Sequence, residues 1–166
     1  MNATLNQSVM AELLSPQELF THWQGHRALT RRTILAFPEK ELFTFSIGGM
    51  RPFSQLVMEM ATLAGPGVKG IASGEWVPID HTGGAQRPTT KEELLDYWDA
   101  ITEEMNTYWP AIEPARFLKV EKAFGAYEGT NFSTIQYLID NEIHHRGQGY
   151  VYLRALGIEP PAFGDR

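Results

Sequence analysis

Cysteine is absent from the 166 residues of this sequence. Disulfide bonds, zinc–thiolate sites and a cysteine nucleophile are therefore excluded, and the composition is compatible with a cytosolic protein. Long apolar runs are lacking as well, since no stretch approaches the roughly 18 residues that a membrane span needs. Residues 1–14 have no basic segment before an apolar core, so they do not resemble a signal peptide. We expect a cytoplasmic protein that does not contact a membrane.

Basic charge is also scarce in this chain. The formal net charge is −6, and the largest basic cluster consists of Arg31 and Arg32 with nearby Arg27. Such a cluster is too small to follow a phosphate backbone, so nucleic acid is not an expected partner. No glycine-rich segment matches a phosphate-binding fingerprint. The expected partner is therefore a small-molecule substrate or ligand.

The length is that of one domain, which we place at residues 15–166 behind a flexible arm of residues 1–14. The first helix should start in the segment Ser15-Pro16-Gln17-Glu18. Serine caps a helix, proline fits its first position, and glutamate at the third position completes a capping box. Pro38 should end this helix near Phe37.

The second helix should begin at Pro52. Within it, Gly65-Pro66-Gly67 predicts a kink or an interruption, after which the apolar pattern resumes as far as Ser73. Residues 74–89 then form a long polar loop that contains His81. A loop of this length is usually functional or mobile, and His81 could close over a pocket.

The third and fourth helices show clear start and stop signals. Thr90 to Glu93 is a capping box, and the helix that follows should reach about Trp109. The fourth helix should start near Asn131 and end just before Gly157, which suits a left-handed cap. Four amphipathic helices without a confident strand predict an all-α four-helix bundle with long connecting loops.

Polar residues interrupt the apolar stripe of the fourth helix. They are Asn141, Glu142, His145 and Gln148. Polar groups that face a core are unfavourable unless they pair with one another, with water or with a metal ion. This stretch is therefore the main candidate for a functional site.

Two interpretations of the polar stretch remain open. His145 and Asn141, with Glu59 on the second helix, could bind a divalent metal ion, because bundles build such sites from facing helices. Alternatively, Glu59 or Glu142 accepts a hydrogen bond from a histidine, and Asn141 bridges two helices, in a buried network that specifies packing. His144 points about 100° away from His145, towards the surface or a dimer contact.

Two other pairs of residues attract attention. His22 and His26 have the i, i+4 spacing of a metal-binding pair, although two histidines on a helix flank are the simpler interpretation. Gly147 and Gly149 weaken a helix by about 1 kcal/mol each relative to alanine. They make sense if another helix or a second copy of the chain approaches closely there.

Several motifs in this chain resemble those of the DinB (damage-inducible, YfiT-like) superfamily. They are the segments 144–148 (HHRGQ), 152–157 (YLRALG), 160–161 (PP), 50–54 (MRPFS) and 70–76 (GIASGEW). The resemblance covers the chain from about residue 15. It implies a DinB/YfiT-type bundle with non-sequential helix order, commonly a homodimer, and a divalent metal such as nickel or zinc, otherwise manganese.

In that family three histidines hold the metal. Carried over by motif, the last of them is His145, whereas the other two positions are Asn141 and Glu59. One histidine of three therefore remains. The site could have a changed ligand set, a different ion or no metal at all.

Characterised members of the family include metal-dependent enzymes that use low-molecular-weight thiols such as bacillithiol or mycothiol. The resemblance thus implies a thiol S-transferase or hydrolase-like enzyme in stress response or detoxification. The thiol would be a cosubstrate, because the chain has no cysteine. The alternative is a non-catalytic bundle that binds a small ligand or is purely structural, and that has lost the metal.

Overall fold

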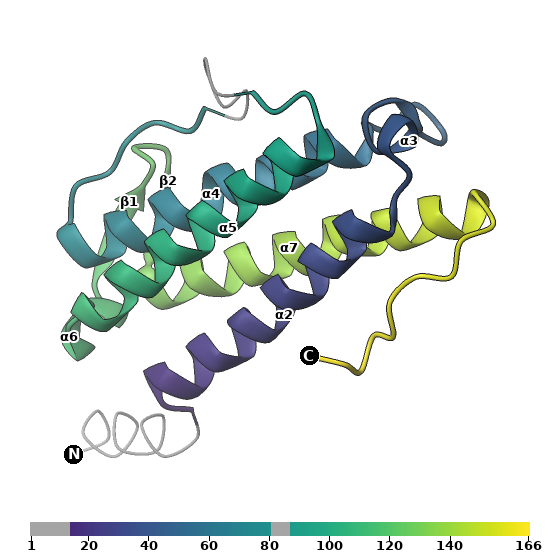
Figure 1. Ribbon diagram of the computed structural model, residues 1–166. Helices are drawn as coiled ribbons and strands as arrows, with labels where there is room; N and C mark the ends of the chain where they lie inside the picture. Colours follow the sequence, from purple (N-terminus) through teal and green to yellow (C-terminus); the bar gives the residue numbers. More distant parts are fainter. Residues whose placement is uncertain (1–13, 81–86) are drawn as a thin grey trace.

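The computed structural model of the protein describes residues 14–80 and 87–166 (Figure 1). Residues 1–13 of the predicted arm and His81 of the long loop lie outside the described residues. The main helices are α2 (Pro16–Ala36), α4 (Phe53–Ser73), α5 (Lys91–Tyr108) and α7 (Asn131–Ala155). None of the described helices is long and apolar enough to cross a membrane.

The main helices do not pack in the order of the chain. Helix α2 contacts α5 and α7, and α4 contacts the same two helices, so that α2 and α4 lie diagonally across the bundle (Figure 1). Such an arrangement needs long connections, which this chain has. The structure confirms the predicted all-α four-helix bundle.

Capping boxes start α2 and α5, as the sequence predicted. In the first, the Ser15 hydroxyl accepts from Glu18 N over 3.2 Å, and Glu18 Oε2 accepts from Ser15 N over 2.8 Å. Thr90 and Glu93 make the same reciprocal pair at α5. Each box satisfies N–H groups that have no partner within the helix, so these helix starts are determined locally.

Helix α4 runs through Pro66 as one continuous helix, so of the two outcomes predicted there the interruption is wrong. A proline removes only one hydrogen bond of the helix, and its neighbours are glycines that allow close packing on both sides. A Cβ atom at Gly67 would lie 2.7 Å from Leu138 Cδ1 on α7, and one at Gly65 would lie 3.2 Å from Ile101 on α5. The two neighbouring helices therefore hold α4 together at this point.

The connection after α5, for which no strand was predicted, contains a small β-hairpin. Strand β1 (Val120–Ala123) pairs antiparallel with β2 (Tyr127–Thr130), with Val120 opposite Thr130. Short helical turns precede it at η2 (Trp109–Ala111) and α6 (Pro114–Phe117), and α3 (Glu39–Thr44) lies between α2 and α4. The hairpin is an addition to the predicted bundle.

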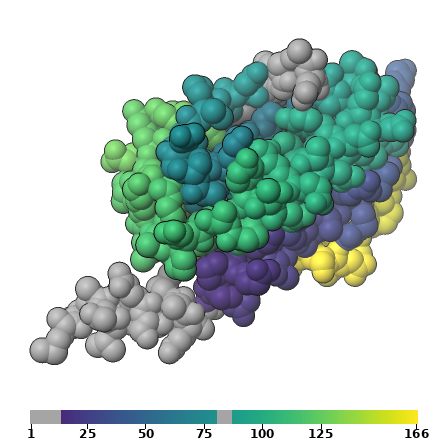
Figure 2. Space-filling view, turned by 60° about the vertical axis from the view of Figure 1, so that its left-hand side comes forward, coloured from purple at the N-terminus to yellow at the C-terminus, as the bar shows by residue number. Residues whose placement is uncertain are grey.

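The turn of the hairpin points an aromatic ring into the protein. Phe124 has a φ angle of 54° and Gly125 one of 71°. A left-handed conformation is unfavourable for phenylalanine, but the buried ring packs edge-on against Trp76 at 5.3 Å. Figure 2 shows the end of the molecule where the hairpin, the segment after α4 and α5 meet.

A partly buried polar cluster fixes the hairpin to the bundle. Glu121 on β1 forms an ion pair with Arg116 at 2.7 Å and accepts a hydrogen bond from Asn131 at 3.0 Å. Arg116 Nε also donates to the carbonyl of Ile71 near the end of α4. The hairpin is thus attached to both α4 and the first turn of α7.

Two glycines on α7 have opposite surroundings. A Cβ atom at Gly149 would overlap the ring of Phe53, which itself stacks on Phe37 with ring centroids 4.8 Å apart. At Gly147 nothing lies within 4 Å of the corresponding position. The close helix contact expected from these glycines is present at Gly149 within one chain.

We predict that Gly149→Ala and Gly147→Ala change stability in opposite directions. The methyl group at residue 149 overpacks the core and should lower the free energy of unfolding by about 1–3 kcal/mol. At residue 147 the gain in helix propensity should raise it by up to about 1 kcal/mol. Urea unfolding of the two variants measures both effects. Equal changes would contradict the described packing.

Candidate functional site

Side chains from two helices meet where α4 packs on α7. Glu59 lies on α4, and Asn141 and His145 lie four residues apart on α7. Asn141 Nδ2 donates to Glu59 Oε1 over 3.3 Å, and His145 Nε2 lies 3.1 Å from the same oxygen. The structure therefore brings together the residues that the sequence analysis selected as tentative metal ligands.

Arg51 completes this cluster and was missed by the sequence analysis. Its Nη2 lies 2.5 Å from Glu59 Oε2. Helical periodicity could not point to it, because Arg51 precedes the start of α4 at Phe53. Burial alone would raise the pKa of Glu59. Hydrogen bonds from Arg51, His145 and Asn141, with the charge of His145, instead lower this pKa to about 2.

The two ring nitrogens of His145 have separate partners. Nδ1 lies 2.7 Å from Gln148 Oε1, and Nε2 faces Glu59. A carboxylate oxygen and an amide oxygen both only accept, so in this arrangement each ring nitrogen is the donor of its contact. Gln148, a predicted pocket residue, thus belongs to the cluster and orients the imidazole. His144 does not, because its side chain is exposed.

This donor set does not suit a nickel or zinc ion. A histidine that binds such an ion needs a free lone pair on its ring nitrogen. In this arrangement His145 Nε2 is instead the donor to Glu59. Asn141 presents its NH₂ group to Glu59, and Arg51 places a positive charge at the other carboxylate oxygen. Within residues 14–80 and 87–166, no cluster of three or more His, Cys, Asp or Glu side chains could hold a metal ion.

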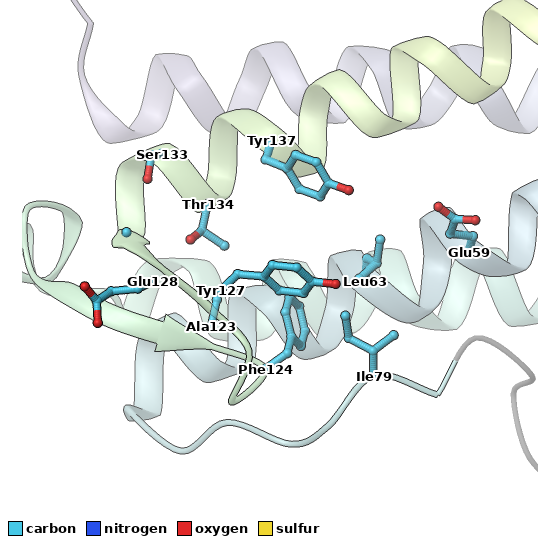
Figure 3. Close-up of a pocket in the computed structure, with 11 residues that line it drawn as sticks. Glu59, Leu63, Ile79, Ala123, Phe124, Tyr127, Glu128, Ser133, Thr134 and Tyr137 are labelled. Atoms are coloured by element: carbon cyan, nitrogen blue, oxygen red, sulfur yellow. The ribbon is translucent and has the colours of Figure 1, made fainter.

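A pocket of about 410 Å³ begins beside Glu59 (Figure 3). It lies between α4, the hairpin and the first turns of α7. Its apolar lining comes from Leu63, Ile79, Ala123 and Phe124. The buried left-handed Phe124 thus gives the hairpin turn a role in shaping the pocket.

The polar lining of the pocket consists of hydroxyl and carboxylate groups. Tyr127 and Tyr137 direct their hydroxyl groups towards the Glu59 end (Figure 3). Ser133, Thr134 and Glu128 complete the polar lining. Among the residues that the structure describes, the lining includes two glutamates but no lysine, arginine or histidine. Electrostatically, the pocket favours neutral or cationic molecules over anions.

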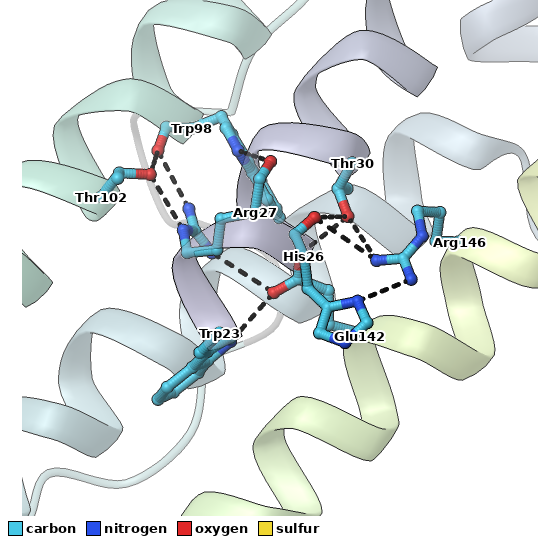
Figure 4. Close-up of polar contacts among 8 residues, drawn as sticks. All are labelled: Trp23, His26, Arg27, Thr30, Trp98, Thr102, Glu142 and Arg146. Atoms are coloured by element: carbon cyan, nitrogen blue, oxygen red, sulfur yellow. Dashed lines mark hydrogen bonds and ion pairs between the residues drawn. The ribbon is translucent and has the colours of Figure 1, made fainter. Parts of the chain in front are cut away.

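Glu142, also predicted for the pocket, lies on a different face of α7, inside the bundle (Figure 4). Its side chain accepts hydrogen bonds from Trp23 Nε1 at 3.1 Å and Thr30 Oγ1 at 2.7 Å. Arg27 Nη1 lies 3.8 Å from the same carboxylate. Glu142 is thus the centre of a buried network whose donors come from α2, not from the histidine or from Asn141 as the sequence analysis considered.

Arg27, which the sequence analysis grouped with Arg31 and Arg32, is almost fully buried. Its guanidinium lies 3.7 Å from the centre of the Trp98 ring and donates to the Trp98 carbonyl at 3.0 Å. Burial lowers the pKa of Arg27 to about 10, so the side chain remains charged at neutral pH. Its spacing from Trp23 and Thr30, on one helix face, was the overlooked signal.

The histidine pair on α2 also belongs to this side of the protein. His22 Nε2 and His26 Nε2 are 3.2 Å apart, and Arg146 Nη2 lies 2.9 Å from His26 Nδ1. Arg166 approaches His26 as well, at 3.2 Å. Burial, and then the charges of Arg146, His22 and Arg166, lower the pKa of His26 to about 4. Two guanidinium groups beside the ring make this pair unsuitable for a metal cation.

Comparisons with known proteins agree with this architecture. A sequence model of the DinB family matches residues 1–165 of the chain. No curated protein matches it. A DinB-like protein of Bacillus subtilis superposes with a TM-score of 0.70 at 19% identity, over 90% of this chain and 99% of that one. A DinB-like protein of Bacillus cereus gives 0.68 at 15% identity, over 88% and 95%. Structural similarity at sequence identities this low shows that the fold is shared, and no more.

We predict that Glu142→Gln destabilises the protein strongly. The change removes the negative charge that compensates the buried Arg27 and Arg146, and such losses cost about 3–5 kcal/mol. Asp140→Asn, an exposed carboxylate on the same helix, serves as the matched control and should change stability by less than about 0.5 kcal/mol. Chemical denaturation compares the two variants, and similar small effects would contradict a charge-compensating role for Glu142.

We also predict a pH dependence of stability from His26. Above pH 6.5 the imidazole is neutral in the folded and unfolded chain, so it contributes no slope. Between pH 6.5 and about 4 only the unfolded chain binds the proton. The free energy of unfolding therefore falls as the pH falls, by at most about 1.4 kcal/mol per pH unit.

The variant His26→Gln isolates this contribution. Glutamine keeps an oxygen acceptor for Arg146 but cannot titrate. Urea unfolding between pH 7.5 and 4.5 should therefore show a shallower slope in the variant than in the natural protein. Parallel curves would show that His26 is not held neutral by the fold.

Proposed function

Because the chain belongs to the DinB family, we propose that it binds a small organic molecule in the pocket beside Glu59, through a site that needs no metal ion. One observation carries the proposal. The carboxylate of Glu59 is already neutralised by N–H donors from Arg51, Asn141 and His145, and the same residue forms one end of the pocket. The cluster then acts as a rigid polar end wall.

The chemistry of the pocket defines the class of ligand. Phe124, Leu63 and Ile79 favour a flat or compact apolar body. Hydroxyl groups from the tyrosines can bond to a polar substituent. The carboxylate of Glu128 favours a neutral or protonated-amine ligand over a carboxylate.

The second candidate is a metal-dependent transferase that uses a bacillithiol- or mycothiol-type thiol in stress or detoxification metabolism. It is favoured by the position of His145, the family ligand that this chain retains. It requires Arg51 to release Glu59 and the imidazole to give up the proton on Nε2. The homodimer and the cytoplasmic location expected from the sequence stay predictions.

A matched set of probes tests the ligand class. Benzylamine, benzyl alcohol and benzoate share a phenyl ring and differ in charge. We expect the amine and the alcohol to bind more tightly than benzoate, by about fivefold. Glu128→Gln should reduce the preference for the amine, whereas Glu103→Gln, an exposed carboxylate on α5, should not. Equal binding of all three probes, or none, in NMR titrations would refute the proposed pocket.

Metal content decides between the two candidates. We expect untagged protein to contain far less than one equivalent of nickel, zinc or manganese by mass spectrometry, and His145→Ala to be the same. One equivalent of metal that disappears in His145→Ala would instead support the thiol transferase. In that case the cluster of Glu59 and Asn141 must rearrange to accept the ion.

A further inference from the structure

A second pocket, of about 300 Å³, lies on another side of α4 from the one beside Glu59. It is formed by the start of α4, by α3 and by the start of α5. Its apolar lining is Phe43, Met58, Pro88 and Leu94. None of the residues that line the first pocket lines this one. The second pocket is therefore a separate feature of the fold.

The charge of the second pocket is opposite to that of the first. Arg51 and Arg87 both line it, and the described part of its lining contains no carboxylate. Arg87 is exposed and makes no ion pair within the part of the chain that the structure describes. Arg51 uses Nη2 for Glu59, and its other guanidinium nitrogens have no partner among the described residues. Two guanidinium groups are thus available to one small cavity.

The pocket also meets the N-terminus of α4. The residue before the helix is Pro52, which provides no side-chain cap. Among the described residues, the backbone N–H groups of Phe53 and Ser54 have no acceptor. Helix N-termini carry partial positive charge and free N–H donors, a combination that attracts anions.

Ser54 adds a hydroxyl donor to the lining of this pocket. The residue is 6% exposed, and it lines the cavity. Its hydroxyl makes no hydrogen bond to any residue that the structure describes. The Ser54 oxygen is not among the fully enclosed side-chain atoms without a partner, so the hydroxyl is open to the cavity and can donate to a ligand there.

We propose that this pocket binds an oxyanion, the phosphate or carboxylate group of a small molecule, between Arg51, Arg87 and Ser54 at the start of α4. Guanidinium groups present paired N–H donors that match both kinds of oxyanion. The serine hydroxyl and the free backbone N–H groups add donors from the helix. The apolar lining lowers the local dielectric and strengthens these contacts.

Arg51 links the second pocket to the cluster around Glu59. An anion that engages Arg51 competes with Glu59 for the same guanidinium group. Occupation of the second pocket therefore loosens the ion pair that holds Glu59 in place. The two pockets become coupled through one side chain, although they share no lining residue.

NMR titrations of the whole protein with inorganic phosphate and with acetate, at constant ionic strength, test this proposal. We expect saturable shifts in the backbone amides of Phe53, Ser54 and Gln55 at millimolar concentration of at least one anion. Stronger binding of phosphate identifies a phosphate site, and stronger binding of acetate a carboxylate site. The absence of saturable shifts with either anion overturns the proposal.

Variants separate a built site from general attraction to positive charge. Arg87→Gln and Ser54→Ala should each weaken binding about tenfold, because each removes a donor to the anion. Arg154→Gln removes an exposed positive charge from α7 and should leave binding unchanged. Equal effects of the three variants overturn the proposal. Neither Arg87 nor Ser54 lines the first pocket, so this result is independent of the function proposed for it.

Discussion

The packing of the bundle depends on one buried carboxylate. Glu142 lies inside the interface of α2 and α7, where two arginines are also buried, and an isolated charge at such a place would be strongly unfavourable. Trp23 and Thr30 on α2 donate to it, and Arg27 balances its charge. Because these partners are fixed in number and direction, α7 can dock on α2 in only one rotation and one axial position.

The rotation of α7 also determines which of its side chains face α4. Asn141 precedes Glu142 by one residue, a turn of about 100° around the helix axis, so the two side chains serve different interfaces. His145 follows Asn141 by one helical turn and therefore also faces α4. The polar stretch of α7 is thus two sites on one helix: a structural network towards α2, and the cluster with Glu59 at the end of a pocket.

Local signals made much of the fold predictable. Capping boxes at Ser15 and Thr90 fix helix starts through neighbouring residues alone, and the contact of Glu59 with α7 followed from family motifs.

What could not be predicted depends on distant partners. The continuity of α4 through Pro66 relies on packing by α5 and α7. The burial of Arg27 relies on Glu142, more than a hundred residues away. The hairpin is short, and its left-handed Phe124 is stabilised by Trp76.

The cluster around Glu59 shows how a bundle can keep a polar site without an ion. Three histidines around one cation would each point a lone pair inward, and the cation would supply the charge. Here the central position is a carboxylate, so the charge is reversed and the neighbours must be donors. Asn141, protonated Nε2 of His145 and Arg51 meet that need. A site in which a carboxylate replaces the cation therefore requires the positive charge of Arg51. Arg51 also lines the second, positively charged pocket.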